Sequence, residues 1–185
     1  MTDLIPISAL GSREPAKLQH GVLTIAENPD LGLASLALRR GDCAPDLGVK
    51  LPGPGGWVSG EGIGAFWIGP DQWMIEGQGR ASADFLHQVS RLAPGCSVTE
   101  QTDAFVDFEI TSQEGGAPVR ALMEKLVNID TAAFGPGRAT RTRLEHMSVF
   151  IIRRAEDRLA VMGMRSLAGS LWHALQTAAR RLNHE

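Results

Sequence analysis

The sequence contains no tyrosine, and it has only two cysteines among its 185 residues. Cys43 and Cys96 are far apart, and neither has a second cysteine or a histidine near it. This arrangement lacks the ligand spacings of structural zinc sites and predicts two reduced thiols. The five histidines show no H-x-x-x-H pairing, so we expect no metal site. Without tyrosine, no phenol is available for catalysis.

Long hydrophobic runs are also missing. No apolar stretch approaches the roughly 20 residues that span a bilayer, and the N-terminus lacks the basic and apolar regions of a signal peptide. The net charge of −3 gives no general attraction to nucleic acid or to anionic membranes. We therefore expect a cytoplasmic protein that binds neither. Its hydrophobic content of 43% and charged content of 21% are those of an ordinary globular domain.

The apolar pattern predicts an α+β fold, in which antiparallel sheets carry helices on one face. Alternating or compact apolar runs predict strands, and apolar positions three and four residues apart predict helices. The predicted strands cover residues 21–26, 31–38, 65–68, 72–75, 103–110, 139–144, 147–153 and 158–164. The predicted helices cover residues 81–93, with Ser82 as N-cap, a segment that begins near Pro118, and a final segment capped by Ser166.

The order of these elements suggests how the chain is organised. Residues 1–19 are predicted to be an N-terminal arm, and residues 20–185 a single domain whose halves, 20–100 and 101–185, form two lobes in an alternative reading. Residues 41–64 are rich in glycine and proline and predict a loop. The strand of residues 103–110 alternates apolar with polar positions, so we expect it to be half-buried, with Asp107 and Glu109 on its second face.

Seven arginines lie within 28 residues near the C-terminal end. Arg141 and Arg143 alternate on one predicted strand, so their side chains project together. They fit a polyanionic folate tail or an acidic partner surface better than nucleic acid, and a plain solvated face is the simplest single interpretation. Arg165 and Ser166 precede the last helix, where an anion could bind at the positive helix end, although an ordinary cap also accounts for Ser166.

Other candidates have both a functional and a structural interpretation. Glu145 and His146 form either a proton-transfer pair or an exposed turn, and Asp103 is either a base or a turn residue. The sequence contains no nucleophile beside its base and no phosphate loop. We therefore assign no catalytic and no metal-binding residue. Three tryptophans are either interface anchors or core residues: Trp57, Trp67 and Trp73.

Five short motifs support a resemblance to a known family. In chain order they are WIGPDQWM (67–74), TEQTDAF (99–105), ALMEKLVNID (121–130), RTRL (141–144) and MRSLA (164–168), the last followed by Leu171 and Trp172. With these motifs, residues 20–182 resemble the aminomethyltransferase family, which includes the folate-binding T-protein of glycine cleavage. Within it, the chain is most similar to the gamma subunits of heterotetrameric sarcosine oxidase.

This resemblance implies a T-protein-like fold with ferredoxin-like βαβ lobes. It implies a complex of alpha, beta, gamma and delta subunits that oxidises sarcosine to glycine and hydrogen peroxide, and passes the methyl-derived carbon to tetrahydrofolate or releases it as formaldehyde. FAD, FMN, NAD and folate would be bound by the alpha and beta subunits and zinc by delta, so this chain alone would bind no cofactor.

The chain also departs from the family pattern. A T-protein is about twice as long and has a catalytic aspartate for which no counterpart aligns here, and the dinucleotide fingerprint is missing. These departures favour a non-catalytic assembly subunit. A stand-alone folate-binding protein like an aminomethyltransferase is the alternative. A folate-dependent helper of iron–sulfur assembly is a third interpretation, which no cysteine motif supports.

Overall fold

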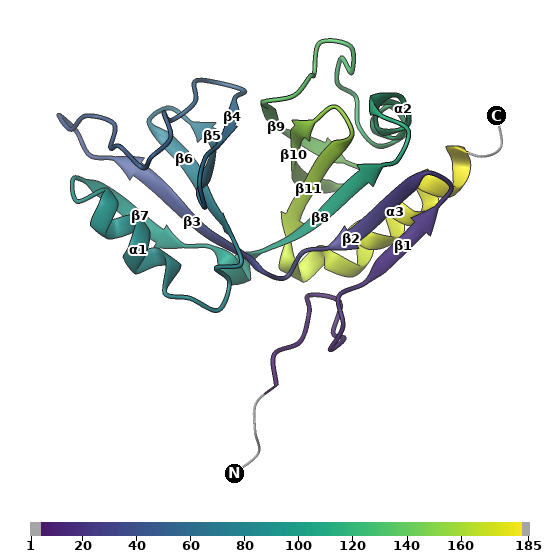
Figure 1. The fold of residues 1–185 in the computed structure, drawn as a ribbon, viewed down its shortest axis with the longest axis horizontal. Helices are drawn as coiled ribbons and strands as arrows, with labels where there is room; N and C mark the ends of the chain where they lie inside the picture. The colour runs from purple at the N-terminus through teal and green to yellow at the C-terminus, as the bar shows by residue number, and fades with distance from the viewer. Residues whose placement is uncertain (1–4, 183–185) are drawn as a thin grey trace.

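The computed structural model describes residues 5–182, which form two antiparallel sheets that face each other (Figure 1). The first sheet has six strands in the order β1 (Lys17–His20), β2 (Leu23–Glu27), β8 (Phe105–Ser112), β11 (Arg158–Met164), β10 (Met147–Ala155) and β9 (Arg138–Leu144). The second has five strands in the order β4 (Trp57–Ser59), β5 (Gly64–Gly69), β6 (Gln72–Gln78), β3 (Leu31–Leu38) and β7 (Cys96–Glu100).

Three helices cover the outer faces of these sheets (Figure 1). Helix α1 (Phe85–Leu92) packs on the second sheet, while α2 (Gly116–Leu126) and α3 (Ala168–Arg181) pack on the first. Short 3-10 turns, η1 (Thr102–Ala104) and η2 (Arg165–Leu167), precede β8 and α3. The layers therefore run helix, sheet, sheet, helix, and the expected α+β class is confirmed. Within residues 5–182, no helix has the length and apolar character needed to cross a membrane.

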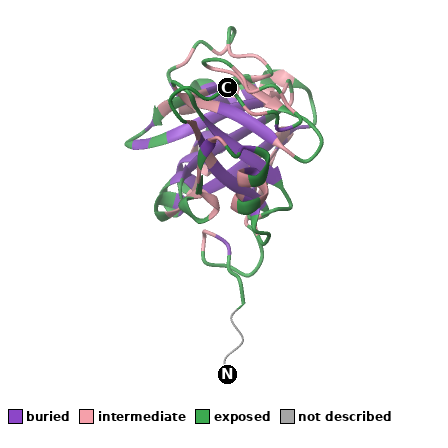
Figure 2. Cartoon of the chain, turned by 90° about the vertical axis from the view of Figure 1, so that its left-hand side faces the viewer, coloured by how far each residue is buried: buried purple, intermediate pink, exposed green. Residues whose placement is uncertain are grey.

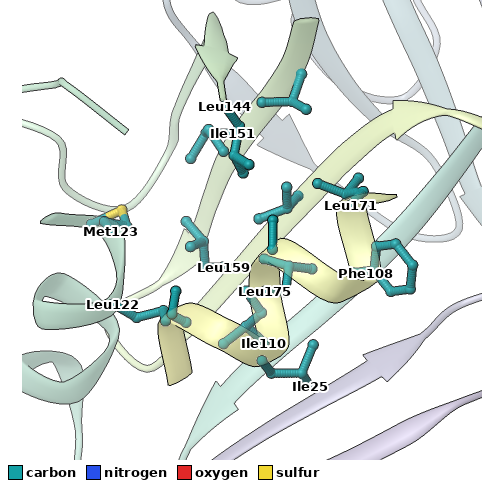
Figure 3. Close-up of a cluster of buried hydrophobic side chains, with 14 of the residues drawn as sticks. Ile25, Phe108, Ile110, Leu122, Met123, Leu144, Ile151, Leu159, Leu171 and Leu175 are labelled. Atoms are coloured by element: carbon teal, nitrogen blue, oxygen red, sulfur yellow. The ribbon is translucent and has the colours of Figure 1, made fainter. Parts of the chain in front are cut away.

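The core consists of three clusters that correspond to these layers. The largest lies between the first sheet and helices α2 and α3 (Figure 3). Phe108 stacks there on Trp172, with 5.4 Å between ring centroids. A second lies under α1, and the third joins the two sheets, where Phe66 meets Phe150 edge to face. Each fully buried leucine, isoleucine or phenylalanine stabilises the fold by about 1.5–3 kcal/mol. Figure 2 shows that the strands carry most of this buried material.

The helix starts differ from the expected ones. Helix α1 begins after Asp84, whose carboxylate accepts a hydrogen bond from the His87 amide at 3.1 Å, so the expected N-cap Ser82 is wrong. Ser166 lies inside η2 and is not the N-cap of α3 either, because Leu167 occupies that position and makes no side-chain cap. A carboxylate at the end of the preceding turn binds a free helix amide as well as serine does.

Several strands were not expected. Residues 41–64 include β4 and the first residue of β5, and β7 follows α1 directly. The expected arm of residues 1–19 overlaps β1, which pairs with β2 at the edge of the first sheet. Strand β2 in turn pairs with β8, so the two N-terminal strands belong to the sheet built by the C-terminal half. Sheet membership therefore does not divide the chain into lobes of 20–100 and 101–185.

The segment before β1 is held to the body by two side chains. The Glu27 carboxylate, which is buried, accepts hydrogen bonds from the Leu10 amide at 3.3 Å and the Ala16 amide at 3.1 Å. Arg165 donates to the carbonyl of Ile7 at 3.2 Å. A buried carboxylate is retained at low energetic cost only when such donors surround it. The N-terminal segment thus lies against the end of the first sheet where β11 finishes.

Candidate functional site

A cluster of charged side chains joins the two sheets. Glu76 of β6 is only 4% exposed, and its carboxylate forms a two-pronged ion pair with the guanidinium of Arg154 from β10, with 3.1 Å between Nη2 and Oε2. The indole nitrogen of Trp57 donates to the same carboxylate at 2.7 Å. The pair therefore bridges the sheets through a bidentate contact, the geometry that arginine forms best with a carboxylate.

Glu109 of β8 completes this cluster. One of its carboxylate oxygens lies 2.6 Å from Nε of Arg154, and the other lies 3.5 Å from Arg158. The Arg154 guanidinium also lies 5.3 Å from the centre of the Trp57 ring. Burial by itself would lower the pKa of Arg154, but the carboxylates of Glu76 and Glu109 raise it above its ordinary value. Arg154 is therefore permanently charged, and its charge is balanced within the chain.

Asp107 lies two residues before Glu109 on the same face of β8. Burial, reinforced by the negative charge of Glu109, raises the pKa of the Asp107 carboxyl to about 8, so the group is protonated at neutral pH. Its Oδ2 accepts a hydrogen bond from the Asn28 amide at 3.0 Å. Its Oδ1 is buried and has no hydrogen-bond partner among the described residues. A protonated carboxyl with one unpartnered oxygen leaves one of its hydrogen-bonding positions unused.

Two cavities flank this cluster. The first, of about 450 Å³, lies beside Asp107, and its walls include the N-terminal segment, Asn28 and Arg165. The second, of about 430 Å³, lies beside Glu76, Glu109 and Arg154, and the glycine-rich stretch of residues 59–64 forms part of its wall. Within residues 5–182, no three acidic, cysteine or histidine side chains are arranged to hold a metal ion. Both cavities have the size of small-molecule pockets.

Gly64 is the point where β5 comes closest to Glu76. A Cβ atom at residue 64 would lie 2.6 Å from the Glu76 Oε1 and 2.9 Å from its Cγ. We expect Gly64→Ala to displace the carboxylate from Arg154 and to lower the free energy of unfolding by about 1–3 kcal/mol in urea titrations. Gly53→Ala, with no atom within 4 Å of the new methyl group, is the control. Equal unfolding midpoints for the two variants would contradict this.

The structure does not gather the expected anion-binding residues into one pocket. Arg141 and Arg143 are exposed on β9, the edge strand of the first sheet, and Arg141 donates from Nε to the Ser148 hydroxyl at 2.9 Å. Arg165 lines the first cavity, while Ser166 lies beside it in η2 and is not among the residues that line the cavity. The other arginines of the expected group are dispersed. Arg154, for example, is buried between the sheets.

The three candidate interface tryptophans all have contacts within the chain. Trp57 binds Glu76, and Trp73, which is buried, donates from its indole nitrogen to the Pro52 carbonyl at 2.7 Å. Trp67 is half-buried and packs against the cluster under α1. Glu145 and His146 form the exposed turn between β9 and β10, in agreement with the structural interpretation of that pair. Asp103 lies in η1, where its side chain is exposed.

Glu76, Asp107, Glu109 and Arg154 are the residues that sequence reasoning missed as a site. The half-buried interpretation of residues 103–110 was wrong, because the second sheet covers the face that carries Asp107. One signal was available in the sequence: Glu76 follows three apolar residues in the run WMIEG, where a charge is unexpected in a strand buried on both faces. The tertiary structure determines which residue pairs with such a buried charge, so the local sequence does not identify the partner.

The comparisons with known proteins place this fold among solved structures. The chain matches a chain of heterotetrameric sarcosine oxidase from Corynebacterium sp. U-96, in complex with pyrrole 2-carboxylate, with 20% identity and a TM-score of 0.70 over 86% of this chain and 84% of that one. It also matches aminomethyltransferase T of the glycine cleavage system from Bartonella henselae, with 13% identity and a TM-score of 0.57 over 80% of this chain.

The second match spans only 44% of the aminomethyltransferase, so this chain corresponds to less than half of that protein. No protein-family model matches the chain, and no curated protein matches it either. The two structural matches confirm the expected T-protein-like fold. At these identities the likeness concerns the fold alone.

Proposed function

We propose that the chain is the gamma, or accessory, subunit of a cytoplasmic sarcosine oxidase complex with alpha, beta and delta partner chains. One observation carries this proposal: the match to a heterotetrameric sarcosine oxidase extends over most of both chains, whereas the aminomethyltransferase is matched over less than half of its length. In such a complex the FAD, FMN, NAD, tetrahydrofolate and zinc sites would belong to the partner chains. This chain would contribute to assembly.

The chemistry of the inter-sheet cluster supports this assignment. Glu76 and Glu109 together balance the charges of Arg154 and Arg158. Side chains that are paired in this way stabilise a fixed geometry, and a general acid or base needs a group that is free to exchange its proton with a substrate. The cluster therefore fits a rigid body that is held together for docking.

Co-production of this chain with the alpha, beta and delta chains tests the proposal. With an affinity tag on this chain, we expect all four chains to elute together and to form hydrogen peroxide when sarcosine is added. The three partners produced without this chain are expected to assemble poorly and to lose activity. Elution of the tagged chain alone, together with full activity of the three partners, would refute the proposal.

A stand-alone folate-binding protein remains the second candidate, because one observation favours it. Asp107, whose carboxyl is protonated at neutral pH, and Arg165 both lie in the wall of the first cavity. Calorimetric titration of the isolated chain with tetrahydrofolate separates the two functions. Micromolar binding that is lost in Arg165→Ala would favour this second function. Loss in Arg141→Ala instead would place the ligand on β9, outside the cavity.

A further inference from the structure

Most of the large apolar side chains that remain exposed among residues 5–182 are gathered in one region. Among residues 5–182 there are five of them: Ile5, Ile7, Leu92, Met164 and Leu167. Met164 and Leu167 are 54% and 37% exposed, and they flank Arg165 at the end of β11 and in η2. Arg165 in turn binds the carbonyl of Ile7, which is 56% exposed. All of the five except Leu92 thus lie on or beside the contact between Arg165 and Ile7.

Strand register extends this region toward β9. Arg143 of β9 lies opposite Ser148 of β10. On the other side of β10, Val149 pairs with Gly163 of β11, so Ser148 lies level with Met164. Arg141 binds the Ser148 hydroxyl and covers the ring of Phe150, with 5.7 Å between its guanidinium carbon and the ring centre. The two arginines therefore project at the end of the sheet where Met164 emerges. We name this region the η2 surface: Ile7, Arg141, Arg143, Met164, Arg165 and Leu167.

The charges of the η2 surface are incompletely balanced. Within the described residues, neither Arg141 nor Arg143 takes part in an ion pair, whereas Arg154 and Arg158 pair with carboxylates between the sheets. Arg165 lies 4.0 Å from the exposed Asp103. Glu145 lies in the exposed turn that follows β9. The surface therefore presents an apolar centre with unpaired guanidinium groups at one side.

We infer that the η2 surface is where this chain docks on a catalytic partner chain, through an apolar patch of the partner that is rimmed by carboxylates. The inference rests on the proposed function and specifies the contact region. Exposed apolar groups that cluster in this way favour protein contacts, and arginine is enriched in interfaces. The guanidinium groups of Arg141 and Arg143 require acidic groups on the partner, which gives orientation and faster association.

Two paired substitutions test this surface in the full complex. Met164→Glu with Leu167→Glu adds charge to the apolar centre, and Arg141→Glu with Arg143→Glu reverses the rim. Arg91→Glu with Leu92→Glu is the matched control, because it changes an exposed arginine and the exposed leucine of α1 on the far sheet. Affinity for the co-produced alpha, beta and delta chains is measured by surface plasmon resonance, and folding by circular dichroism.

We expect the dissociation constant to rise at least about 100-fold for the apolar pair. For the arginine pair we expect a rise of about 10-fold or more, with a weaker dependence of the association rate on salt. The control pair is expected to bind within about threefold of the wild type. Unchanged affinity in both η2 pairs, with wild-type binding intact, would overturn the docking surface and leave the proposed function standing.

Two other outcomes are informative. If the folded wild type binds none of the partner chains, the proposed function fails and the docking surface fails with it. Sedimentation of the isolated chain tests for a second copy as the occupant of the surface. A dimer that the Met164 and Leu167 substitutions dissociate, while partner binding is unaffected, would overturn the inference in favour of self-association.

Discussion

Replacement of Arg154 by methionine is expected to lower the free energy of unfolding by about 3–5 kcal/mol, the cost of leaving a buried carboxylate without its cation. Glu76 is 4% exposed, and apart from Arg154 its carboxylate is bound by the Trp57 indole. Methionine has a similar length and no charge, so the effect reports the unpaired charge more than lost packing. Urea denaturation followed by circular dichroism measures it.

The same experiment contains two internal controls. Arg158→Met removes a cation whose side chain is 52% exposed and which lies 3.5 Å from Glu109, so we expect a loss of at most about 1 kcal/mol. Combining Arg154→Met with Glu76→Gln removes both charges and is expected to restore part of the stability. If Arg154→Met cost no more than Arg158→Met, the cluster would not join the sheets energetically.

Replacement of Asp107 by asparagine is expected to change how stability depends on pH. The wild-type carboxyl has an ordinary pKa of 3.8 when unfolded and a pKa of about 8 when folded. Between these values the folded chain holds more protons than the unfolded chain, so rising pH destabilises the wild type by up to about 1.4 kcal/mol per pH unit. Below pH 3.8 and well above pH 8, Asp107 does not contribute to the change of the unfolding free energy with pH.

Asparagine removes this titration and keeps an oxygen that accepts from Asn28. We therefore expect the stability of Asp107→Asn relative to the wild type to rise from pH 4 to pH 8 by up to about 1.4 kcal/mol per pH unit, with Asp107→Asn the more stable of the two at pH 8. The difference between the two unfolding free energies, measured across this range, isolates the effect of Asp107. Asp103→Asn is the control, because the side chain of Asp103 is 96% exposed. A difference that stays constant with pH would contradict the raised pKa.

Much of the fold was predictable, because alternation and apolar runs identify strands regardless of their partners. Strands β3, β9, β10 and β11 were placed within a few residues of their observed bounds. Helix ends were less predictable: Ser82 and Asp84 are both good N-caps, and the geometry of the preceding turn decides between them. Short edge strands such as β4, with three residues in a glycine-rich stretch, carry almost no periodic signal.

The candidate site was harder to predict from the sequence than the fold, for a related reason. Alternation in residues 103–110 shows two faces and does not reveal that a second sheet covers the face of Asp107 and Glu109. The arginines of residues 138–165 looked like one basic region, but adjacent residues on a strand point to opposite sides. Arg153 thus lies toward helix α2, while Arg154 lies between the sheets with Glu76. The way in which the two sheets stack determines which charged side chains come into contact.

The pairing of β2 with β8 has a consequence for synthesis on the ribosome. About 80 residues separate these strands, so Leu23 and Ile25 emerge from the exit tunnel long before Ile110 is made. At about 5–20 residues per second, the wait lasts roughly 4–16 s. Every strand of the second sheet lies between them in sequence, within residues 31–100, and pairs only within that sheet. That sheet can therefore form first, while the nascent N-terminal hairpin stays available to chaperones.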